Sequence, residues 1–229
     1  MLTPIIDVRE DETRGIGEIS CWFRRPRTLE PQVLHTLESL AVQAELVLDH
    51  LALQDRIRHR ALHDGLTGLA NRILLEEQLE QILSQSRRNQ QACAVLFLDL
   101  DGFKKINDQL GHAVGDEVLI TVADRLRATC RSGEVVSRLG GDEFVIAAAD
   151  LDEEGAAQLA ERVWQVVRAS LEGSAAGMPL SSSVGVMTWD PASDAPTPTS
   201  SSLLAAADAA MYEVKRTGRD AVFIRAWQG

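Results

Sequence analysis

The sequence predicts a mixed α/β (α+β) fold of the ferredoxin-like βαββαβ type, in which helices flank a central antiparallel sheet. Residues 91–98 form a short, continuous apolar run, which is typical of a buried strand. Further along, two apolar runs flank Gly140-Gly141, and paired glycines there favour a tight hairpin because both can adopt positive φ. Helical patterns separate the strands, in the order strand 91–98, helix 114–131, hairpin strands 135–139 and 144–149, helix 152–171 and strand 179–189.

Composition limits the class of protein. The 229 residues are 45% hydrophobic and 25% charged, which is ordinary for a globular domain with an appendage. A net charge of −11 argues against broad nucleic-acid binding. No run approaches the roughly 18 apolar residues of a membrane helix, and the N-terminus lacks a signal-peptide pattern. The three cysteines, Cys21, Cys93 and Cys130, have no paired spacing. We therefore expect a cytoplasmic protein without a membrane segment in this chain.

The N-terminal part begins with a candidate strand at residues 16–23, ended near Pro26, and continues into a long helix at residues 29–63. Pro31 suits the first turn of that helix. Apolar or small residues recur at alternating spacings of three and four, which predicts a coiled-coil seam that pairs two chains. An amphipathic helix packed on its own domain is the alternative. The seam positions are Leu34, Leu37, Ala41, Ala44, Leu48 and Leu51, after which Asp55 and Arg58 break the phase.

The remaining elements follow from turn and capping signals. Residues 63–72 form a glycine-containing turn, and Asn71 is placed to cap a helix at 73–88. A loop rich in Pro, Ser and Thr occupies residues 190–202. It precedes a last helix at 203–216 and a last strand at 221–225.

Three carboxylates are candidates for chemistry. Asp142 and Glu143 lie at the tip of the hairpin, and Asp99 follows the first buried strand. In a βαββαβ sheet the first strand and the hairpin are neighbours, so these side chains can converge at one edge. Palm domains of nucleotidyl transferases use such carboxylates to hold two Mg²⁺ ions on a triphosphate. A solvated acidic turn is the alternative for an isolated hairpin of this kind.

Four separate motifs now agree in order and spacing, and the chain resembles the GGDEF-domain diguanylate cyclases over residues 61–224. These bacterial enzymes join two GTP into cyclic di-GMP at the interface of a homodimer. The motifs are DGLTGLANR (64–72), FLDLDGFKKINDQLGHAVGDEVL (97–119), RLGGDEF (138–144) and ADAAMYEVKRTGRD (207–220).

The resemblance implies a role for each matching residue. Asp142 and Glu143 match the catalytic acids, and two Mg²⁺ (or Mn²⁺) ions per active site are expected on Asp99, the Leu100 carbonyl, Asp142 and Glu143. Lys215 and Arg219 are four apart, so we expect both on one face of a helix end, near the terminal phosphates. The GTP-binding positions are Asn107 and Asp116 for guanine, together with Lys104, His112, Gly140, Gly141, Lys215 and Arg219.

The chain departs from the family pattern at three places. The inhibitory product-binding motif, Arg-x-x-Asp, here runs from Arg131 to Glu134. Val214 stands where the family has a small Ala, and Asp220 where it has Asn. The longer Glu134 side chain predicts weakened product inhibition, and plain surface charges at a helix end are the alternative.

Three segments are expected. Residues 1–28 resemble the end of a GAF sensor domain, a likeness that extends over 17–53 but is too short for a whole GAF domain. Residues 29–62 form a signalling and dimerisation helix, and residues 63–229 the GGDEF domain. The function expected is an active cyclase. The alternative is a catalytically silent GGDEF module that binds GTP or cyclic di-GMP as a regulatory receptor.

Overall fold

The structure, a computed structural model, describes residues 2–9, 12–20 and 30–229, and the chain divides into units Met1–Ala61 and Leu62–Gly229. In the first unit, β1 (Leu2–Arg9) pairs antiparallel with β2 (Glu12–Ser20). The single strand predicted at 16–23 was wrong in extent: β2 begins earlier, β1 was not predicted, and residues 21–23 lie outside the described residues. The likeness of residues 1–28 to a GAF domain falls partly on undescribed residues and stays a prediction.

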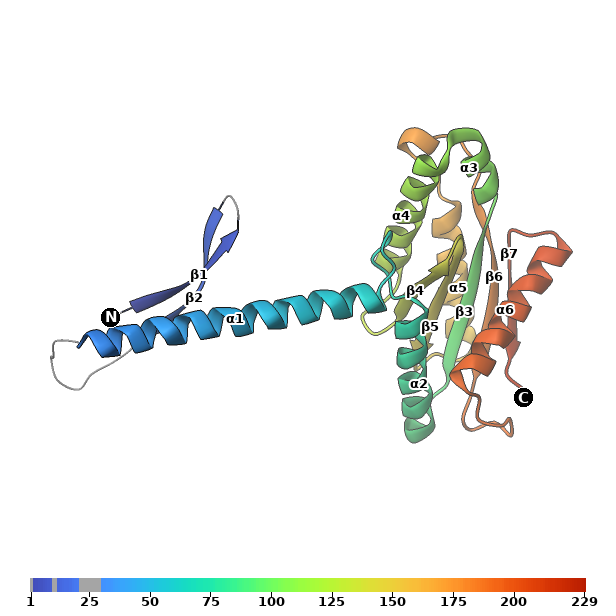
Figure 1. Cartoon of the computed structure of the whole chain (residues 1–229). Helices are drawn as coiled ribbons and strands as arrows, with labels where there is room; N and C mark the ends of the chain where they lie inside the picture. The colour runs from blue at the N-terminus through green and yellow to red at the C-terminus, as the bar shows by residue number, and fades with distance from the viewer. Residues whose placement is uncertain (1, 10–11, 21–29) are drawn as a thin grey trace. The chain divides into compact units, whose positions relative to one another are not determined.

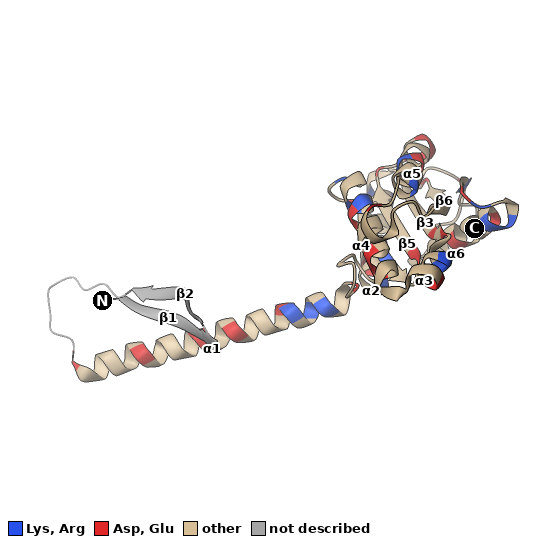
Figure 2. Ribbon diagram, turned by 90° about the horizontal axis from the view of Figure 1, so that it is seen from above, with Lys and Arg blue, Asp and Glu red and all other residues tan. Residues whose placement is uncertain are grey.

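The long helix of the first unit is α1 (Pro31–Leu62), which confirms the predicted helix with Pro31 as its first residue. Much of its apolar surface is exposed; Leu46 is 71% and Leu51 54% accessible. Lys and Arg occur only in the last third of α1, after a longer stretch whose charges are acidic (Figure 2). Among the described residues, no helix combines the length and apolar character needed to span a bilayer.

The second unit is built on one five-stranded sheet with the order β4-β5-β3-β6-β7 (Figure 1). The predicted βαββαβ arrangement is confirmed, with β3 between β5 and β6. The sheet is not wholly antiparallel, because the last strand pairs parallel with β6 at the edge. The strands are β3 (Cys93–Asp101), β4 (Val135–Gly140), β5 (Glu143–Ala149), β6 (Ser181–Trp189) and β7 (Ala221–Ala226).

Helices cover both faces of this sheet. The predicted Asn71 cap is confirmed, since its side chain accepts hydrogen bonds from the backbone N–H groups of Ile73 and Leu74. The last helix begins three residues earlier than predicted, because the Thr199 and Ser202 side chains form a reciprocal capping box. The helices are α2 (Arg72–Asn89), α3 (Phe103–Leu110), α4 (His112–Thr129), α5 (Glu153–Arg168), a short 3₁₀ turn at Gly173–Ala175, and α6 (Ser200–Thr217).

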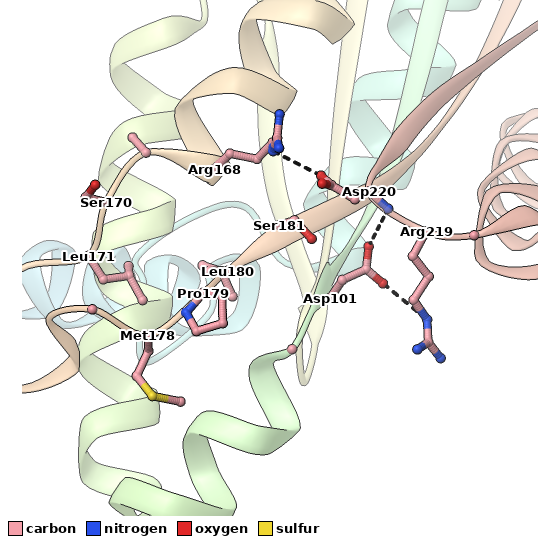
Figure 3. A pocket seen from close by; sticks show the side chains of 14 residues that line it. Asp101, Arg168, Ser170, Leu171, Met178, Pro179, Leu180, Ser181, Arg219 and Asp220 are labelled. Atoms are coloured by element: carbon pink, nitrogen blue, oxygen red, sulfur yellow. Dashed lines mark hydrogen bonds and ion pairs between the residues drawn. The ribbon is translucent and has the colours of Figure 1, made fainter.

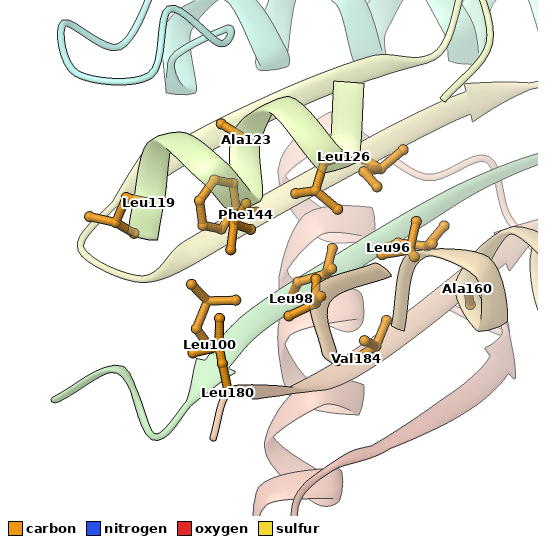
Figure 4. Packing of buried hydrophobic residues seen from close by; sticks show 14 of the residues in the cluster. Leu96, Leu98, Leu100, Leu119, Ala123, Leu126, Phe144, Ala160, Leu180 and Val184 are labelled. Carbon is orange, nitrogen blue, oxygen red and sulfur yellow. The ribbon is translucent and has the colours of Figure 1, made fainter. Parts of the chain in front are cut away.

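Strand alternation divides the core into two layers. Leu96, Leu98 and Leu100 of β3 pack with α4 and α5 on one face of the sheet (Figure 4). Val95 and Phe97 pack with α2 and α6 on the other. The next residues of this second series are Asp99 and Asp101, so the α2–α6 face changes from apolar to acidic at one end of β3.

Helix α6 approaches the sheet closely at Gly185 of β6. A Cβ atom at this position would lie 2.1 Å from the Met211 backbone nitrogen and 2.4 Å from the Ala207 carbonyl oxygen. Only a residue without a side chain allows this approach. Gly185 thereby brings the C-terminal end of α6, with Lys215, over the acidic end of β3.

Candidate active site

Two of the predicted carboxylates lie opposite each other on neighbouring strands. Asp99 of β3 pairs with Glu143 of β5 in the antiparallel register, which places both side chains on the α2–α6 face. Asp99 is 8% exposed. β3 extends to Asp101, so Asp99 lies inside the strand rather than after it as the sequence suggested. The predicted convergence of β3 and the hairpin is confirmed for these two residues.

The third carboxylate, Asp142, lies in the hairpin turn. The predicted Gly-Gly turn was displaced by one residue: Gly140 ends β4, and the turn residues are Gly141 and Asp142. Both glycines have positive φ, at 145° and 53°, which explains the absence of side chains there. The Leu100 N–H donates to the Asp142 carbonyl oxygen at 3.2 Å and fixes the turn against the end of β3.

Cationic side chains face these acids. Lys215 Nζ lies 2.6 Å from Asp99 Oδ2, and its side chain is 27% exposed. Asp99 and Asp142 border a cavity of about 580 Å³, large enough for part of a nucleotide. Its other lining residues are Leu100, Asp101, Gly102, Lys104, Lys105, Asp108, Gln109, Lys215 and Arg219.

Burial, together with neighbouring carboxylates, shifts the pKa values of two of these acids. Burial raises the pKa of Asp99 above its usual range, and the neighbouring Asp142 and Asp101 add to this; Lys215 offsets the rise only in part. Burial also raises the pKa of Glu143, with contributions from Asp208, Asp99 and Asp142. Burial and the neighbouring carboxylates thus both favour the protonated form of Asp99 and of Glu143.

Arg219 borders the cavity, but it does not lie on the helix as predicted. α6 ends at Thr217, so Arg219 does not share a helical face with Lys215; it lies in the following turn with φ of 65°. Its Nε is 3.5 Å from Asp101 Oδ1 (Figure 3). The other oxygen of Asp101 accepts hydrogen bonds from the Ser183 hydroxyl at 2.7 Å and from the Asp220 N–H at 3.2 Å. Asp101 thus ties together the ends of β3, β6 and the turn that carries Arg219.

Asp220, where the family pattern has Asn, anchors the same turn from the other side. Its Oδ1 forms an ion pair with Arg168 Nε at 3.1 Å (Figure 3). The same oxygen accepts a hydrogen bond from Trp164 Nε1 at 3.1 Å. The Arg168 guanidinium also stacks over the Trp164 ring, 4.2 Å from its centre. The Asp220 carboxylate therefore forms an ion pair with Arg168, which a neutral Asn at this position could not form.

Arg138, two residues before Gly140, has a role that the sequence analysis did not assign. Its Nη1 lies 2.9 Å from Asp64 Oδ1, and its Nε and Nη2 donate to the Gly141 carbonyl oxygen at 3.1 and 2.8 Å. Burial raises the pKa of Asp64, but hydrogen bonds from Thr67 and the Arg138 charge outweigh this and hold it below its ordinary value. The sequence did contain a signal for these two residues, because Asp64 and Arg138 each begin one of the four family motifs. Arg138 links the segment after α1 to the turn that carries Asp142.

The donor set suits a hard divalent cation. Carboxylate and carbonyl oxygens are the ligands that Mg²⁺ prefers, and Asp99, Asp142, Glu143 and the Leu100 carbonyl supply them. Among the described residues, no three acidic, His or Cys side chains are already gathered closely enough to hold an ion. Lys215 instead provides the positive charge beside Asp99. The residues therefore fit a metal ion in the chemistry of their donor atoms.

Comparison with known proteins places this geometry in a family. Residues 61–221 match the family model described as "Diguanylate cyclase, GGDEF domain". This chain belongs to the GGDEF family.

Relatives and solved structures agree with that assignment. The chain is 35% identical over 220 residues to the diguanylate cyclase TpbB of Pseudomonas aeruginosa, covering 89% of this chain and 49% of that protein. It is 42% identical over 160 residues to the bifunctional diguanylate cyclase/cyclic di-GMP phosphodiesterase MucR of the same species, covering 70% of this chain and 23% of MucR. The chain thus spans less than half the length of these relatives.

Among solved structures, the coiled coil and GGDEF domain of DgcB from Caulobacter crescentus, in complex with c-di-GMP, aligns with a TM-score of 0.73 and 26% identity. That alignment covers 85% of this chain and 100% of the solved DgcB chain. The diguanylate cyclase SiaD of Pseudomonas aeruginosa, solved with its activator SiaC, has a TM-score of 0.67 and 30% identity, over 85% of this chain and 74% of the solved SiaD chain.

Other predicted residues of the GGDEF domain lie outside the cavity beside Asp142. Asn107 is half-buried in the second turn of α3, and Asp116 is exposed in the first turns of α4. His112 is the exposed first residue of α4. These three positions are grouped around the α3–α4 junction. Residues of α3 on either side of Asn107 line the cavity, but Asn107, His112 and Asp116 do not.

The candidate inhibitory residues close a local turn at the end of α4. The Glu134 carboxylate accepts a hydrogen bond from the Arg131 backbone N–H at 2.8 Å, and the Glu134 N–H donates to the Arg131 carbonyl at 3.1 Å. Glu134 is thus engaged within its own turn, while the Arg131 side chain carries no hydrogen bond within the described part of the chain.

Proposed function

We propose that this chain is an active diguanylate cyclase, which condenses two GTP into cyclic di-GMP and releases two pyrophosphates. One observation carries the proposal: Asp99 and Glu143 face each other in register, with Asp142 in the adjoining turn, beside Lys215 and a cavity of about 580 Å³. Family membership and the complete Gly-Gly-Asp-Glu-Phe signature support it. Degenerate signatures mark the silent, receptor-like modules, whereas the signature of this chain is intact.

The reaction forms two phosphodiester bonds. In each step the 3′-hydroxyl of one GTP attacks the α-phosphorus of the other, the bond to the pyrophosphate breaks, and the hydroxyl proton passes to a carboxylate. Two Mg²⁺ (or Mn²⁺) ions per site, when bound, would lower the pKa of the hydroxyl and neutralise developing charge. We assign their ligands as Asp99, the Leu100 carbonyl, Asp142 and Glu143. The structural difference between Asp142, in the turn, and Glu143, in the strand, suits different tasks for the two acids.

Cations and base-reading groups bind the rest of the nucleotide. Lys104, Lys215 and Arg219 border the cavity and would compensate the phosphates that the acidic protein as a whole repels. Gly140 and Gly141 leave open space where side chains would stand, which allows the turn backbone to approach GTP. Asn107 and Asp116 are assigned to guanine, and His112 to the same end of the site. A carboxylate can accept from the adjacent N1–H and N2–H₂ donors of guanine, which adenine lacks.

The reaction requires two sites that face each other, because each domain binds one GTP. We propose that the exposed apolar surface of α1 pairs two chains in parallel as a coiled coil and thereby supplies the homodimer. In DgcB, the solved chain joins a coiled coil to a GGDEF domain, which supports this reading. The GTP substrate and the free thiols of Cys93 and Cys130 suit a cytoplasmic location.

The proposal is tested by incubating the purified chain with GTP and Mg²⁺ and separating the products by chromatography. Wild type should yield cyclic di-GMP and pyrophosphate, and Asp142→Ala should yield neither while keeping its fold by circular dichroism. Asp194→Ala makes the same chemical change at an exposed loop residue and serves as the matched control. Near-normal turnover by Asp142→Ala would refute the site assignment. Binding of GTP or cyclic di-GMP without turnover by wild type would identify the receptor instead.

A further inference from the structure

Gly115, in the first turns of α4, is buried against a predicted guanine-binding residue. A Cβ atom at Gly115 would lie 1.9 Å from Asn107 Oδ1 and 2.9 Å from Asn107 Cγ. Phe103 Cζ, at 3.4 Å, would be in ordinary contact with it. The amide of Asn107 therefore occupies the space that any side chain at Gly115 would need. Glycine inside a helix costs about 0.5–1 kcal/mol relative to alanine, so its presence here calls for such a reason.

The turn between α3 and α4 produces this contact. Gly111 joins the two helices with φ of 86°, a conformation that favours glycine. Its N–H donates to the Asn107 carbonyl at 2.9 Å, and the Gly115 N–H donates to the Gly111 carbonyl at 3.2 Å. α4 consequently folds back along α3 at the same end of the sheet (Figure 1). The Asn107 side chain thus lies against Gly115, the residue directly before Asp116.

Packing, rather than hydrogen bonding, orients the Asn107 side chain. Within the described part of the chain, no hydrogen bond of the domain uses its amide group, so both its donor and its acceptor remain available to a ligand. The group is half-buried and rests on the α4 backbone at Gly115. A methyl group there would have to displace the amide oxygen by about 1.5 Å to restore ordinary contact. Hydrogen bonds tolerate only a few tenths of an ångström, so such a shift would remove the contact to a bound base.

We propose that Gly115 is a positioning residue that sets selectivity for guanine, acting through the orientation of Asn107. The inference rests on the proposed function, in which Asn107 and Asp116 recognise the guanine of GTP. It adds a determinant that touches no substrate atom. Because the effect passes through one side chain, it should vanish when that side chain is removed.

The experiment compares Gly115→Ala with Gly155→Ala. Both changes add one methyl group near the start of a helix, but at Gly155 the methyl meets mainly the flexible Leu151 side chain. Affinities for GDP and ADP are measured by titration calorimetry with Mg²⁺. We expect Gly115→Ala to weaken GDP binding at least tenfold and to leave ADP binding unchanged, whereas Gly155→Ala should bind both as wild type does.

Asn107→Ala and the double variant complete a mutant cycle. In the Asn107→Ala background, Gly115→Ala should cause no further loss of GDP affinity. In the same background, Gly115→Ala should no longer lower the thermal stability, because the Asn107 amide that the new methyl would meet is absent. The cycle therefore remains informative even if Gly115→Ala alone fails to fold. Unchanged GDP affinity in Gly115→Ala, or an equal loss in both backgrounds, would overturn the proposal. Wild type that binds ADP as tightly as GDP would instead overturn the guanine assignment on which the proposal rests.

Discussion

Replacing Arg138 by Met should destabilise the GGDEF domain and slow its reaction together. The Arg138 side chain is 10% exposed and Asp64 21% exposed, so the pair is largely removed from water. Met fills similar space but leaves the Asp64 carboxylate without its cation and the Gly141 carbonyl without its two donors. Breaking a buried pair from one side costs about 3–5 kcal/mol, and partial exposure favours the lower end of that range. We expect the free energy of unfolding to fall by about 3 kcal/mol.

The assay is urea unfolding of wild type, Arg138→Met, Asp64→Asn and the double variant. Because the two residues share one contact, the double variant should lose at least about 1 kcal/mol less than the sum of the single losses. Arg216→Met is the matched control: Arg216 pairs with Glu213 at 2.9 Å, but these side chains are 63% and 50% exposed. That surface pair should contribute less than about 1 kcal/mol.

The same variants test whether the ion pair positions the turn that carries Asp142, a proposed catalytic residue. Without the two hydrogen bonds from Arg138 to the Gly141 carbonyl, the position of Asp142 should be less well fixed. Turnover should therefore fall at least about tenfold under conditions where the protein stays folded. Arg216→Met should retain normal turnover. An Arg138→Met protein as stable as wild type, or additive losses in the cycle, would refute the reasoning.

The ion pair also has a pH signature. The pKa of Asp64 is lowered by folding, so its ionised form stabilises the folded state above the unfolded-state pKa of about 3.9. That contribution is lost as the pH falls through the folded-state value. The stability difference between wild type and Asp64→Asn should therefore be full at neutral pH and shrink below about pH 4, as measured by urea unfolding at several pH values. A difference that stays constant down to pH 2 would contradict the assignment.

Three further outcomes are expected. Gly185→Ala should cost about 3 kcal/mol in urea unfolding or prevent folding, because the new methyl would meet the Met211 backbone rather than a movable side chain; a stability like that of wild type would disprove the close approach of α6. In a titration of cyclic di-GMP, product inhibition should be tighter in Glu134→Asp than in wild type and absent in Arg131→Ala, while three identical curves would mean that no inhibitory site exists there. Deleting residues 1–60 should make specific activity fall steeply on dilution, and equal activity of both chains across concentrations would exclude a dimerising role for α1.

The sequence by itself determined the order and type of most elements in the second unit. Apolar runs and helical periodicity are local properties, and burial on a sheet or against a helix selects for them directly. The strand next to Asp99 and the hairpin at Gly140-Gly141 were predicted for this reason, although β3 extends further and the turn lies one residue later. The Asn71 cap followed from capping chemistry, which is equally local. Family membership followed in the same way, because its motifs are contiguous stretches of residues.

Only the tertiary structure decided which side chains meet. Arg138 and Asp64 are 74 residues apart, and Asp101 and Ser183 are 82 apart, so their contacts depend on strand register and helix packing rather than on local pattern. Arg219 shows the limit of local reasoning: its spacing from Lys215 predicted a shared helical face, but the helix ends at Thr217 and Arg219 turns to Asp101. The sequence likewise does not distinguish Gly115 and Gly185 from other glycines. In the folded chain, the Asn107 side chain occupies the space beside Gly115, and the α6 backbone occupies the space beside Gly185. Close packing between distant segments leaves no local trace except the smallness of the residue that permits it.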